Sequence, residues 1–315
     1  EKVTKETTWS IADLFGRMGC KQSRAPPSGV IIVCTNSAKV ELDDTKGEKV
    51  TKETGLWLEE AAGPYKVFTE AGLKVTMASL SGGKVPVDAG SKEGDFYTDA
   101  CKAFDEGEDT KNLLESTAKL SDLAKSLKSY DAIFLAGGFG TIGDFKGSTE
   151  LAAILTEACK AGVIVAAVCH GPVGLLSVKE GEEAFLKGVA VTGFSSAEEK
   201  MCGYAEKNSV QSEMEKLGAV YTCAEAFKAH VVTAEKDGAA IVTGQNPGSS
   251  VGCAEKVVEL IKAKKPKAEP KAEPEAEEKA EEKAEEKKAE EKKAEVKKAE
   301  EIAEDEKPEE KKAEE

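Results

Sequence analysis

The chain has 315 residues and a formal net charge of −15 at pH 7, and so acidic a protein repels phosphate backbones, which argues against a nucleic-acid partner. Its only two arginines, Arg17 and Arg24, precede the segment that we expect to fold. A site in that segment therefore has no guanidinium group with which to bind a carboxylate or a phosphate, and this lack favours a small neutral substrate. The sequence has neither an apolar run long enough to span a bilayer nor a signal-peptide pattern, which excludes a membrane partner and predicts a cytoplasmic protein.

Composition divides the chain into three parts. Residues 1–28 end in Ala-Pro-Pro-Ser-Gly and are expected to form a poorly ordered extension. Residues 263–315 are almost entirely Ala, Glu, Lys and Pro, which cannot build a core and predict a helical or disordered charged tail of low complexity. The segment 29–262 is therefore the expected catalytic domain.

Within that domain, apolar segments that suit buried strands alternate with segments that suit helices. In chain order we expect a strand at 30–34, a helix at 59–71, a strand at 74–79, a helix at 113–127, a strand at 132–136, a helix at 149–161, a strand at 163–168, a helix from about 173, strands at 189–192, 219–222, 230–233 and 240–243, and a helix at 250–263. This pattern predicts an α/β fold whose mostly parallel sheet carries helices on both faces. Ligands bind at the carboxyl ends of the strands in such sheets.

The strongest chemical signal lies at the end of the strand at 163–168. This strand runs directly into Cys169-His170-Gly171-Pro172 and then into the expected helix, which is the pattern of a nucleophile elbow. A thiol at a helix N-terminus is predicted to have a lowered pKa. The eight cysteines include no CxxC pair and only two histidines accompany them, so neither a zinc site nor any other metal is expected. Cys169 is the candidate nucleophile.

Two further patterns lie near other strand ends. The strand at 132–136 leads into Gly137-Gly138-Phe139-Gly140, whose backbone N–H groups can face a developing oxyanion. Glu59 and Glu60 open the helix that follows the loop after the first strand. Acidic residues are common at helix starts for electrostatic reasons alone, so this pattern by itself does not favour a catalytic role.

Together these motifs resemble the ThiJ/PfpI superfamily, and within it the glyoxalase III branch of heat-shock-type proteins. The resemblance covers about residues 30–262 and rests on the segments GLWLEEAAGPY (55–65), EAGLKVTMAS (70–79), GGKVPVD (82–88), YDAIFLAGG (130–138), AAVCHGP (166–172), VTGF (191–194) and TGQNP (243–247). It implies a flavodoxin-like sandwich that is often dimeric, so a homodimer is one expectation. No cofactor is implied.

The resemblance also implies roles for particular residues. Cys169 is the nucleophile with His170 beside it, and the glutamate of the early helix corresponds to Glu60, with Glu59 as the second choice. The oxyanion and substrate-binding positions are Gly137, Gly138 and Gly171. Members of this branch usually carry His after the paired glycines, and this chain has Phe139 there, which argues against a zinc-dependent variant. His230 is interpreted as a structural residue, with a supporting role near the site as the alternative.

The function that follows is a glutathione-independent glyoxalase. The Cys169 thiolate attacks the aldehyde of methylglyoxal or a similar 2-oxoaldehyde, Glu60 moves a proton between the adjacent carbons, and water releases a 2-hydroxy acid. A redox-responsive stress chaperone and a deglycase of proteins or nucleotides are the alternatives that use the same thiol. A cysteine protease is less favoured, because the sequence shows no third member of a triad.

Overall fold

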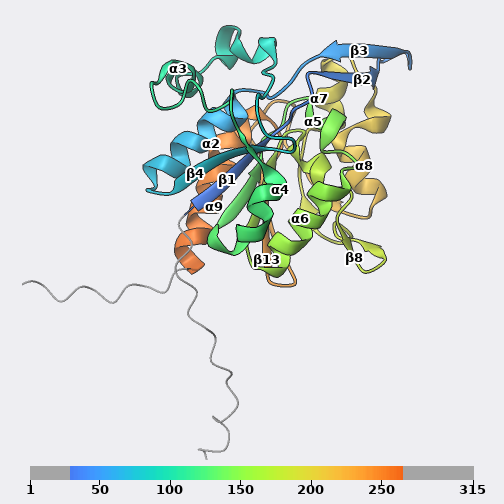
Figure 1. The fold of residues 1–315 in the computed structure, drawn as a ribbon. Coiled ribbons are helices and arrows are strands. Elements are labelled where there is room, and N and C mark those ends of the chain that lie inside the picture. Colours follow the sequence, from blue (N-terminus) through green and yellow to red (C-terminus); the bar gives the residue numbers. More distant parts are fainter. Residues whose placement is uncertain (1–28, 265–315) are drawn as a thin grey trace, which may run out of the picture. The chain divides into compact units, whose positions relative to one another are not determined.

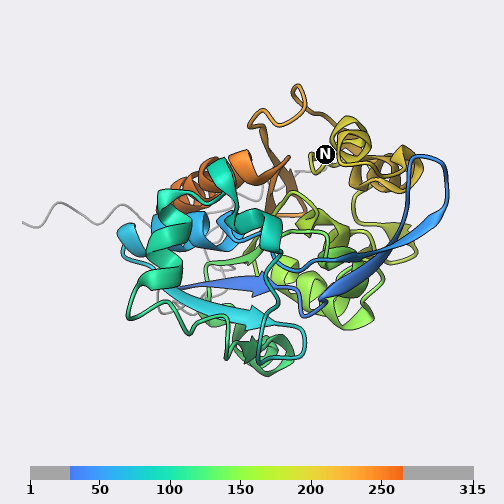
Figure 2. The same cartoon turned by 90° about the horizontal axis from the view of Figure 1, so that it is seen from above.

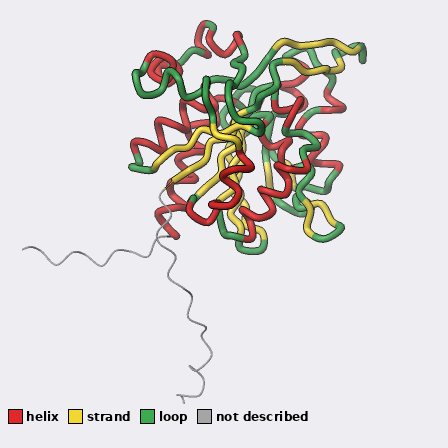
Figure 3. Tube along the Cα trace, in the orientation of Figure 1, coloured by secondary structure: helices red, strands yellow, loops and turns green. Residues whose placement is uncertain are grey.

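The computed structural model describes residues 29–264, which contain one large sheet with helices on both faces (Figures 1 and 3). The sequence expectations for residues 1–28 and 265–315 lie outside the described residues. In the order of hydrogen-bonded neighbours, the seven strands of the sheet are β12 (Val231–Lys236), β13 (Ala239–Gly244), β7 (Ile164–Val168), β6 (Ala132–Leu135), β1 (Gly29–Cys34), β4 (Lys74–Ser79) and β5 (Ala118–Lys119). Every neighbouring pair is parallel except β12 and β13.

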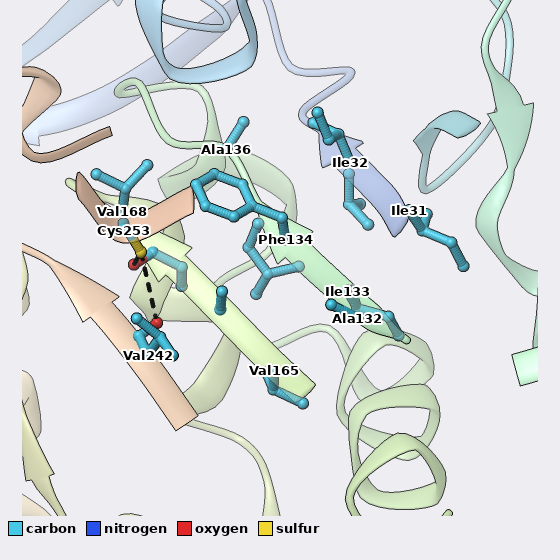
Figure 4. Packing of buried hydrophobic residues seen from close by; sticks show 14 of the residues in the cluster. Ile31, Ile32, Ala132, Ile133, Phe134, Ala136, Val165, Val168, Val242 and Cys253 are labelled. Carbon is cyan, nitrogen blue, oxygen red and sulfur yellow. Dashed lines mark hydrogen bonds between the residues drawn. The ribbon is translucent and has the colours of Figure 1, made fainter. Parts of the chain in front are cut away.

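The central strands form because their residues are apolar along the whole length. All residues of β1, β6, β7 and β13 are buried, as expected for parallel strands covered on both faces. Figure 4 shows how their side chains fill the core around Phe134 and Val165, with Cys253 of the last helix packed against Val242. The predicted α/β class with a mostly parallel sheet is confirmed.

Helices cover the sheet in two groups. On one face α2 (Glu59–Glu70) packs against β1, β4 and α9 (Ser250–Lys264), and α9 packs on β7 and β13. The other face carries α6 (Thr149–Lys160), which contacts β7 and β13 (Figure 1). The remaining helices are α3 (Asp99–Glu106), α4 (Leu120–Leu123), α5 (Thr141–Asp144), α7 (Ser196–Met201) and α8 (Val210–Lys216), with the 3₁₀ helices η1 (Ala89–Lys92), η2 (Gly94–Phe96), η3 (Ala124–Ser129), η4 (Gly171–Leu175), η5 (Glu206–Asn208) and η6 (Pro247–Ser249).

Three small two-stranded sheets lie outside the main one. They are β2 (Lys39–Asp43) with β3 (Lys49–Glu53), β8 (Lys179–Glu180) with β9 (Glu183–Ala184), and β10 (Ala190–Val191) with β11 (Val220–Tyr221). In the view from above, the β2–β3 hairpin extends away from the sheet (Figure 2). The predicted strands at 189–192 and 219–222 are thus present, but they pair with each other and not with the central sheet.

Two helix predictions are wrong. Residues 113–127 form turns, the edge strand β5, α4 and η3 in place of one helix. The cause is tertiary: the backbone N–H of Thr117 donates to the carbonyl of Gly83, and the N–H of Gly83 donates to the carbonyl of Thr117, which draws the segment to the sheet edge. The leucines still serve the core, with Leu114, Leu120 and Leu127 buried. After Cys169 the chain forms the five-residue η4 and not an α-helix.

The strand order creates the place for a site. From β1 the chain adds β4 and β5 on one side and then returns to add β6, β7 and β13 on the other. The direction of winding therefore reverses between β1 and β6, and ligands of open parallel sheets bind at the carboxyl ends of strands at such a point. Gly137 follows β6 and Cys169 follows β7, so both predicted loops lie at this edge.

Candidate active site

Cys169 occupies a strained backbone position between β7 and η4. Its φ angle is 59°, a conformation that residues other than glycine seldom adopt and that clusters at functional sites. Its N–H donates to the carbonyl of Gly244 at 2.9 Å, and its own carbonyl accepts the N–H of Phe194 at 2.8 Å. The neighbouring strand and loop thereby hold the elbow that turns the thiol out of the sheet.

The Glu60 carboxyl lies against the Cys169 thiol. Glu60 is fully buried in the first turn of α2, and its Oε2 accepts the backbone N–H of Gly137 at 2.8 Å. Its Oε1 is buried without a nitrogen or oxygen partner. Burial raises the pKa of Glu60 to about 8, although its hydrogen bonds with Cys169 and Gly137 act in the opposite direction. Because Oε2 accepts an N–H, the proton of the neutral carboxyl belongs on Oε1.

The thiol itself has a raised and not a lowered pKa. Its residue is 4% exposed, and this burial raises the pKa of Cys169 well above its usual value, with the nearby Glu60 charge adding to the effect. The backbone N–H of Gly138 facing the sulfur lowers the pKa by less. The prediction of a thiolate stabilised by a helix N-terminus is wrong, because η4 is a single short 3₁₀ segment and the sulfur lies out of water.

His170 offers the thiol a proton acceptor. Its Nδ1 lies 3.3 Å from the Cys169 sulfur, and its Nε2 lies 2.9 Å from Oε1 of Glu199 in α7. All three side chains are buried. A carboxylate at Nε2 fixes the tautomer in which Nε2 carries the proton and Nδ1 is free to accept one. No third member of a triad is evident from the sequence, and in the structure the Glu199 carboxyl contacts the imidazole on the side away from the thiol.

Aromatic rings pack around the imidazole. The centroids of Phe139 and Phe194 lie 4.3 and 4.5 Å from that of His170. Phe139 thus packs an apolar ring beside the histidine, at the position where the family resemblance led us to expect a His side chain. Among residues 29–264, no group of three or more His, Cys, Asp or Glu side chains is arranged to hold a metal ion. Likewise, no helix in this range is long and apolar enough to cross a membrane.

The three predicted glycines have different surroundings. Gly138 has a φ of +101°, and a Cβ there would lie 2.4 Å from the carbonyl oxygen of Gly55, so the close approach of two loops requires glycine. The N–H of Gly137 is engaged by Glu60 and is not free for an oxyanion. Gly171 packs so closely on the end of β6 that a Cβ would lie 2.4 Å from the carbonyl oxygen of Leu135. The backbone N–H of Gly138 faces the Cys169 sulfur.

Glu59 and His230, the other candidates, make their hydrogen bonds to residues other than Cys169. Glu59 accepts hydrogen bonds from the Thr98 hydroxyl and, at 3.4 Å, from the Cys101 thiol, which ties α2 to α3. His230 is half-buried, and its Nε2 lies 3.0 Å from the hydroxyl of Thr222. Glu60 and not Glu59 is therefore the acid brought to Cys169.

The thiol opens into a cavity of about 470 Å³. Besides Cys169, His170 and Gly138, its lining residues come from the loops at the carboxyl ends of the strands and from the segments that cover them: Trp57, Glu59, Asp95, Phe96, Thr98, Phe139, Phe194, Cys202, Phe227, Asn246, Pro247, Gly248 and Val251. A nucleophile, a buried acid and an imidazole thus meet at one concave, largely apolar site, the arrangement expected of a small-molecule active site.

Comparison with known proteins identifies the family. Residues 50–260 match the model of the DJ-1/PfpI family, and the chain belongs to this family. It is 34% identical over 219 residues to Glyoxalase 3 of Candida albicans, covering 66% of this chain and 89% of that protein. It is 33% identical over 223 residues to a glutathione-independent glyoxalase of Schizosaccharomyces pombe, covering 67% and 90% of the two chains.

Solved structures agree with the sequence comparison. The crystal structure of glyoxalase III from Candida albicans matches with a TM-score of 0.61 and 28% sequence identity, covering 74% of this chain and 97% of that one. The Rapid Encystment Protein of Francisella tularensis matches with a TM-score of 0.62 and 27% identity, covering 74% and 99%. The family resemblance inferred from the sequence motifs is confirmed.

Proposed function

We propose that this enzyme is a glutathione-independent glyoxalase, which converts methylglyoxal-type 2-oxoaldehydes to 2-hydroxy acids through a hemithioacetal on Cys169. The observation that carries the proposal is the placement of a protonatable carboxyl and a carboxylate-linked imidazole on the same buried thiol. The similarity to named glyoxalases supports the substrate class.

The first step forms the carbon–sulfur bond. The Cys169 sulfur attacks the aldehyde carbon while its proton passes to Nδ1 of His170, 3.3 Å away. The neutral Glu60 carboxyl gives its proton to the aldehyde oxygen, which yields a hemithioacetal and leaves Glu60 ionised. Glu199 on Nε2 stabilises the imidazolium that forms. The high pKa of the resting thiol is compatible with this route, because ionisation accompanies the attack.

The second step moves hydrogen between neighbouring carbons. Ionised Glu60 removes the proton from the former aldehyde carbon while the His170 imidazolium protonates the ketone oxygen, which gives an enediol. The protonated carboxyl then returns a proton to the adjacent carbon as the hydroxyl of the sulfur-bearing carbon gives its proton back to His170. A carboxyl with a pKa near 8 exchanges protons in both directions near neutral pH. The resulting thioester is hydrolysed by water, which releases the 2-hydroxy acid and the thiol. The balance needs no metal, nucleotide or added thiol, and we propose that the enzyme is a cofactor-independent lyase of the lactate dehydratase type.

The direct test is lactate formation from methylglyoxal by the purified full chain, without glutathione and in the presence of a chelator. We expect turnover under these conditions and no increase when glutathione is added. A dependence on added thiol, or the loss of all turnover with the chelator, would contradict the mechanism.

Deglycation is the second candidate function. A segment is 35% identical over 96 residues to the protein/nucleic acid deglycase HchA of Escherichia coli, which is 34% of that protein. The same thiol and acid would act on an aldehyde carried by an amine. Release of free amine from a methylglyoxal-treated peptide would measure it. The redox-chaperone alternative remains a prediction without such support, since a thiol buried at a raised pKa is a poor peroxide target.

Replacing Glu199 by glutamine is expected to lower kcat/KM for methylglyoxal by about 10²- to 10⁴-fold, because the amide neither balances the imidazolium nor enforces the tautomer. The variant is isosteric, so thermal unfolding should change far less. Glu157→Gln, an exposed change in α6, serves as the control. Equal activity in the two variants would remove Glu199 from the mechanism.

A further inference from the structure

The cavity is larger than a three-carbon aldehyde requires. Its volume of about 470 Å³ falls within the range of pockets that enclose drug-sized ligands. Methylglyoxal has the bulk of only a few water molecules, each of which takes about 30 Å³ in the liquid. A substrate bound through its aldehyde carbon to Cys169 would leave most of the cavity empty unless its other end carried a large group.

The walls indicate the chemistry of that group. Aromatic rings dominate them, with Phe96 packed edge-to-face on Trp57 at a centroid distance of 5.1 Å. The carboxylates that line the cavity belong to Glu59 and Asp95, and no lysine between residues 29 and 264 lines it. An anionic substituent would meet like charge at these two carboxylates, and the nearby Lys52, 5.2 Å from the Phe139 ring, is already paired with Asp88. An apolar ring would meet rings.

Phe227 lines this cavity and has an unusual backbone conformation and exposure. Its φ angle is 61°, which is strained for a bulky residue, and its side chain is 47% exposed although it is large and apolar. Its backbone N–H donates at 2.8 Å to Oε1 of Glu198, a fully buried carboxylate that also accepts from Asn246. This buried carboxylate holds the backbone at Phe227, whose ring lines the cavity with its centroid 6.3 Å from that of Phe194.

The rest of the rim is also apolar and exposed. Phe96 is 54% exposed and Val251 is 38% exposed, and both line the cavity with Phe227. Together, Phe96, Phe227 and Val251 form what we call the apolar rim. Exposed apolar side chains that line one cavity indicate a binding role, because an apolar group that enters the cavity buries them.

We infer that the preferred substrates are 2-oxoaldehydes with a large apolar substituent, such as aryl glyoxals, and that Phe227 of the apolar rim determines this preference. The inference rests on the proposed function and specifies its substrate class. The aldehyde carbon reacts at Cys169, and the substituent packs along the aromatic wall as far as the apolar rim.

The test compares kcat/KM for phenylglyoxal and methylglyoxal in the wild-type chain and in Phe227→Ala. We expect a ratio of at least about tenfold in favour of phenylglyoxal in the wild type. The variant should lower this ratio about tenfold, mainly through KM for phenylglyoxal. Phenylglyoxal with a para-carboxylate should be used at least about tenfold less well than phenylglyoxal. Val220→Ala, which removes an exposed apolar side chain outside the cavity, should leave the ratio unchanged.

Val251→Ala gives an independent reading from another element, α9, and should lower the ratio in the same direction. Phenylglyoxal also modifies arginine, but the two arginines of the chain precede residue 29. Turnover of methylglyoxal with a ratio below one, or a ratio that neither rim variant changes, would overturn the inference and leave the proposed function standing. Failure to convert either aldehyde would overturn both.

Discussion

Replacing Cys169 by alanine is expected to remove lactate formation from methylglyoxal, with a fall in kcat of at least about 10³-fold. Without the sulfur no hemithioacetal forms, and the neighbouring acid and imidazole have no bound intermediate on which to act. The activity is measured as lactate released without glutathione, and mass spectrometry should detect a methylglyoxal adduct at residue 169 of the wild type alone.

The matched control for this variant is Cys202→Ala. Cys202 also lines the cavity, and it is more exposed than Cys169. It has no imidazole partner comparable to His170 among the hydrogen bonds of the described residues, so its loss should leave most of the activity. If Cys202→Ala were the inactive variant and Cys169→Ala retained turnover, the thiol chemistry would have been assigned to the wrong residue.

The site illustrates which features local sequence can reveal. Cys169 was predictable because an apolar strand followed by Cys-His-Gly-Pro specifies both a buried strand and the turn at its end. Glu60 was predicted through family resemblance, since acidic residues open many helices for electrostatic reasons. Glu59 and Glu60 are adjacent in α2, so their side chains point in different directions. Glu60 reaches the N–H of Gly137, whereas Glu59 contacts the Thr98 hydroxyl.

Other features depend on tertiary contacts and were out of reach. Glu199 lies 29 residues after His170 in a helix whose start, at Ser195 and Glu198, reads as an ordinary capping box. The pKa of the thiol was predicted in the wrong direction, because its sign is set by burial and by Glu60, which is distant in sequence. The helix predicted at 113–127 is absent for the same reason. The leucine spacing favours a helix, but the backbone pairing of Thr117 with Gly83 holds this segment at the sheet edge.

Glu60→Gln is expected to have the second large effect and to separate activity from stability. The amide cannot carry a proton between the two carbons, so kcat should fall by about 10²- to 10⁴-fold. Glu59→Gln is the matched control on the same helix and should retain most of the activity, because Glu59 contacts Thr98 and Cys101 and not the thiol. A reversed order of the two variants would return the catalytic role to Glu59.

Stability should respond to the same change in a pH-dependent way. The pKa of Glu60 is about 8 in the folded chain, against an ordinary value of 4.5, so the folded state binds more protons between these values. The contribution of the neutral carboxyl is therefore complete below pH 4.5 and is lost as the pH rises through 8. Glutamine stays neutral throughout, so only the wild type loses this contribution as the pH rises. The free energy of unfolding of Glu60→Gln, measured with urea, should therefore rise relative to that of the wild type by up to about 4 kcal/mol from pH 5 to pH 8.5. A difference that is the same at both pH values would mean that folding does not raise the pKa of Glu60, and no neutral carboxyl would then be present to protonate the aldehyde oxygen in the first step.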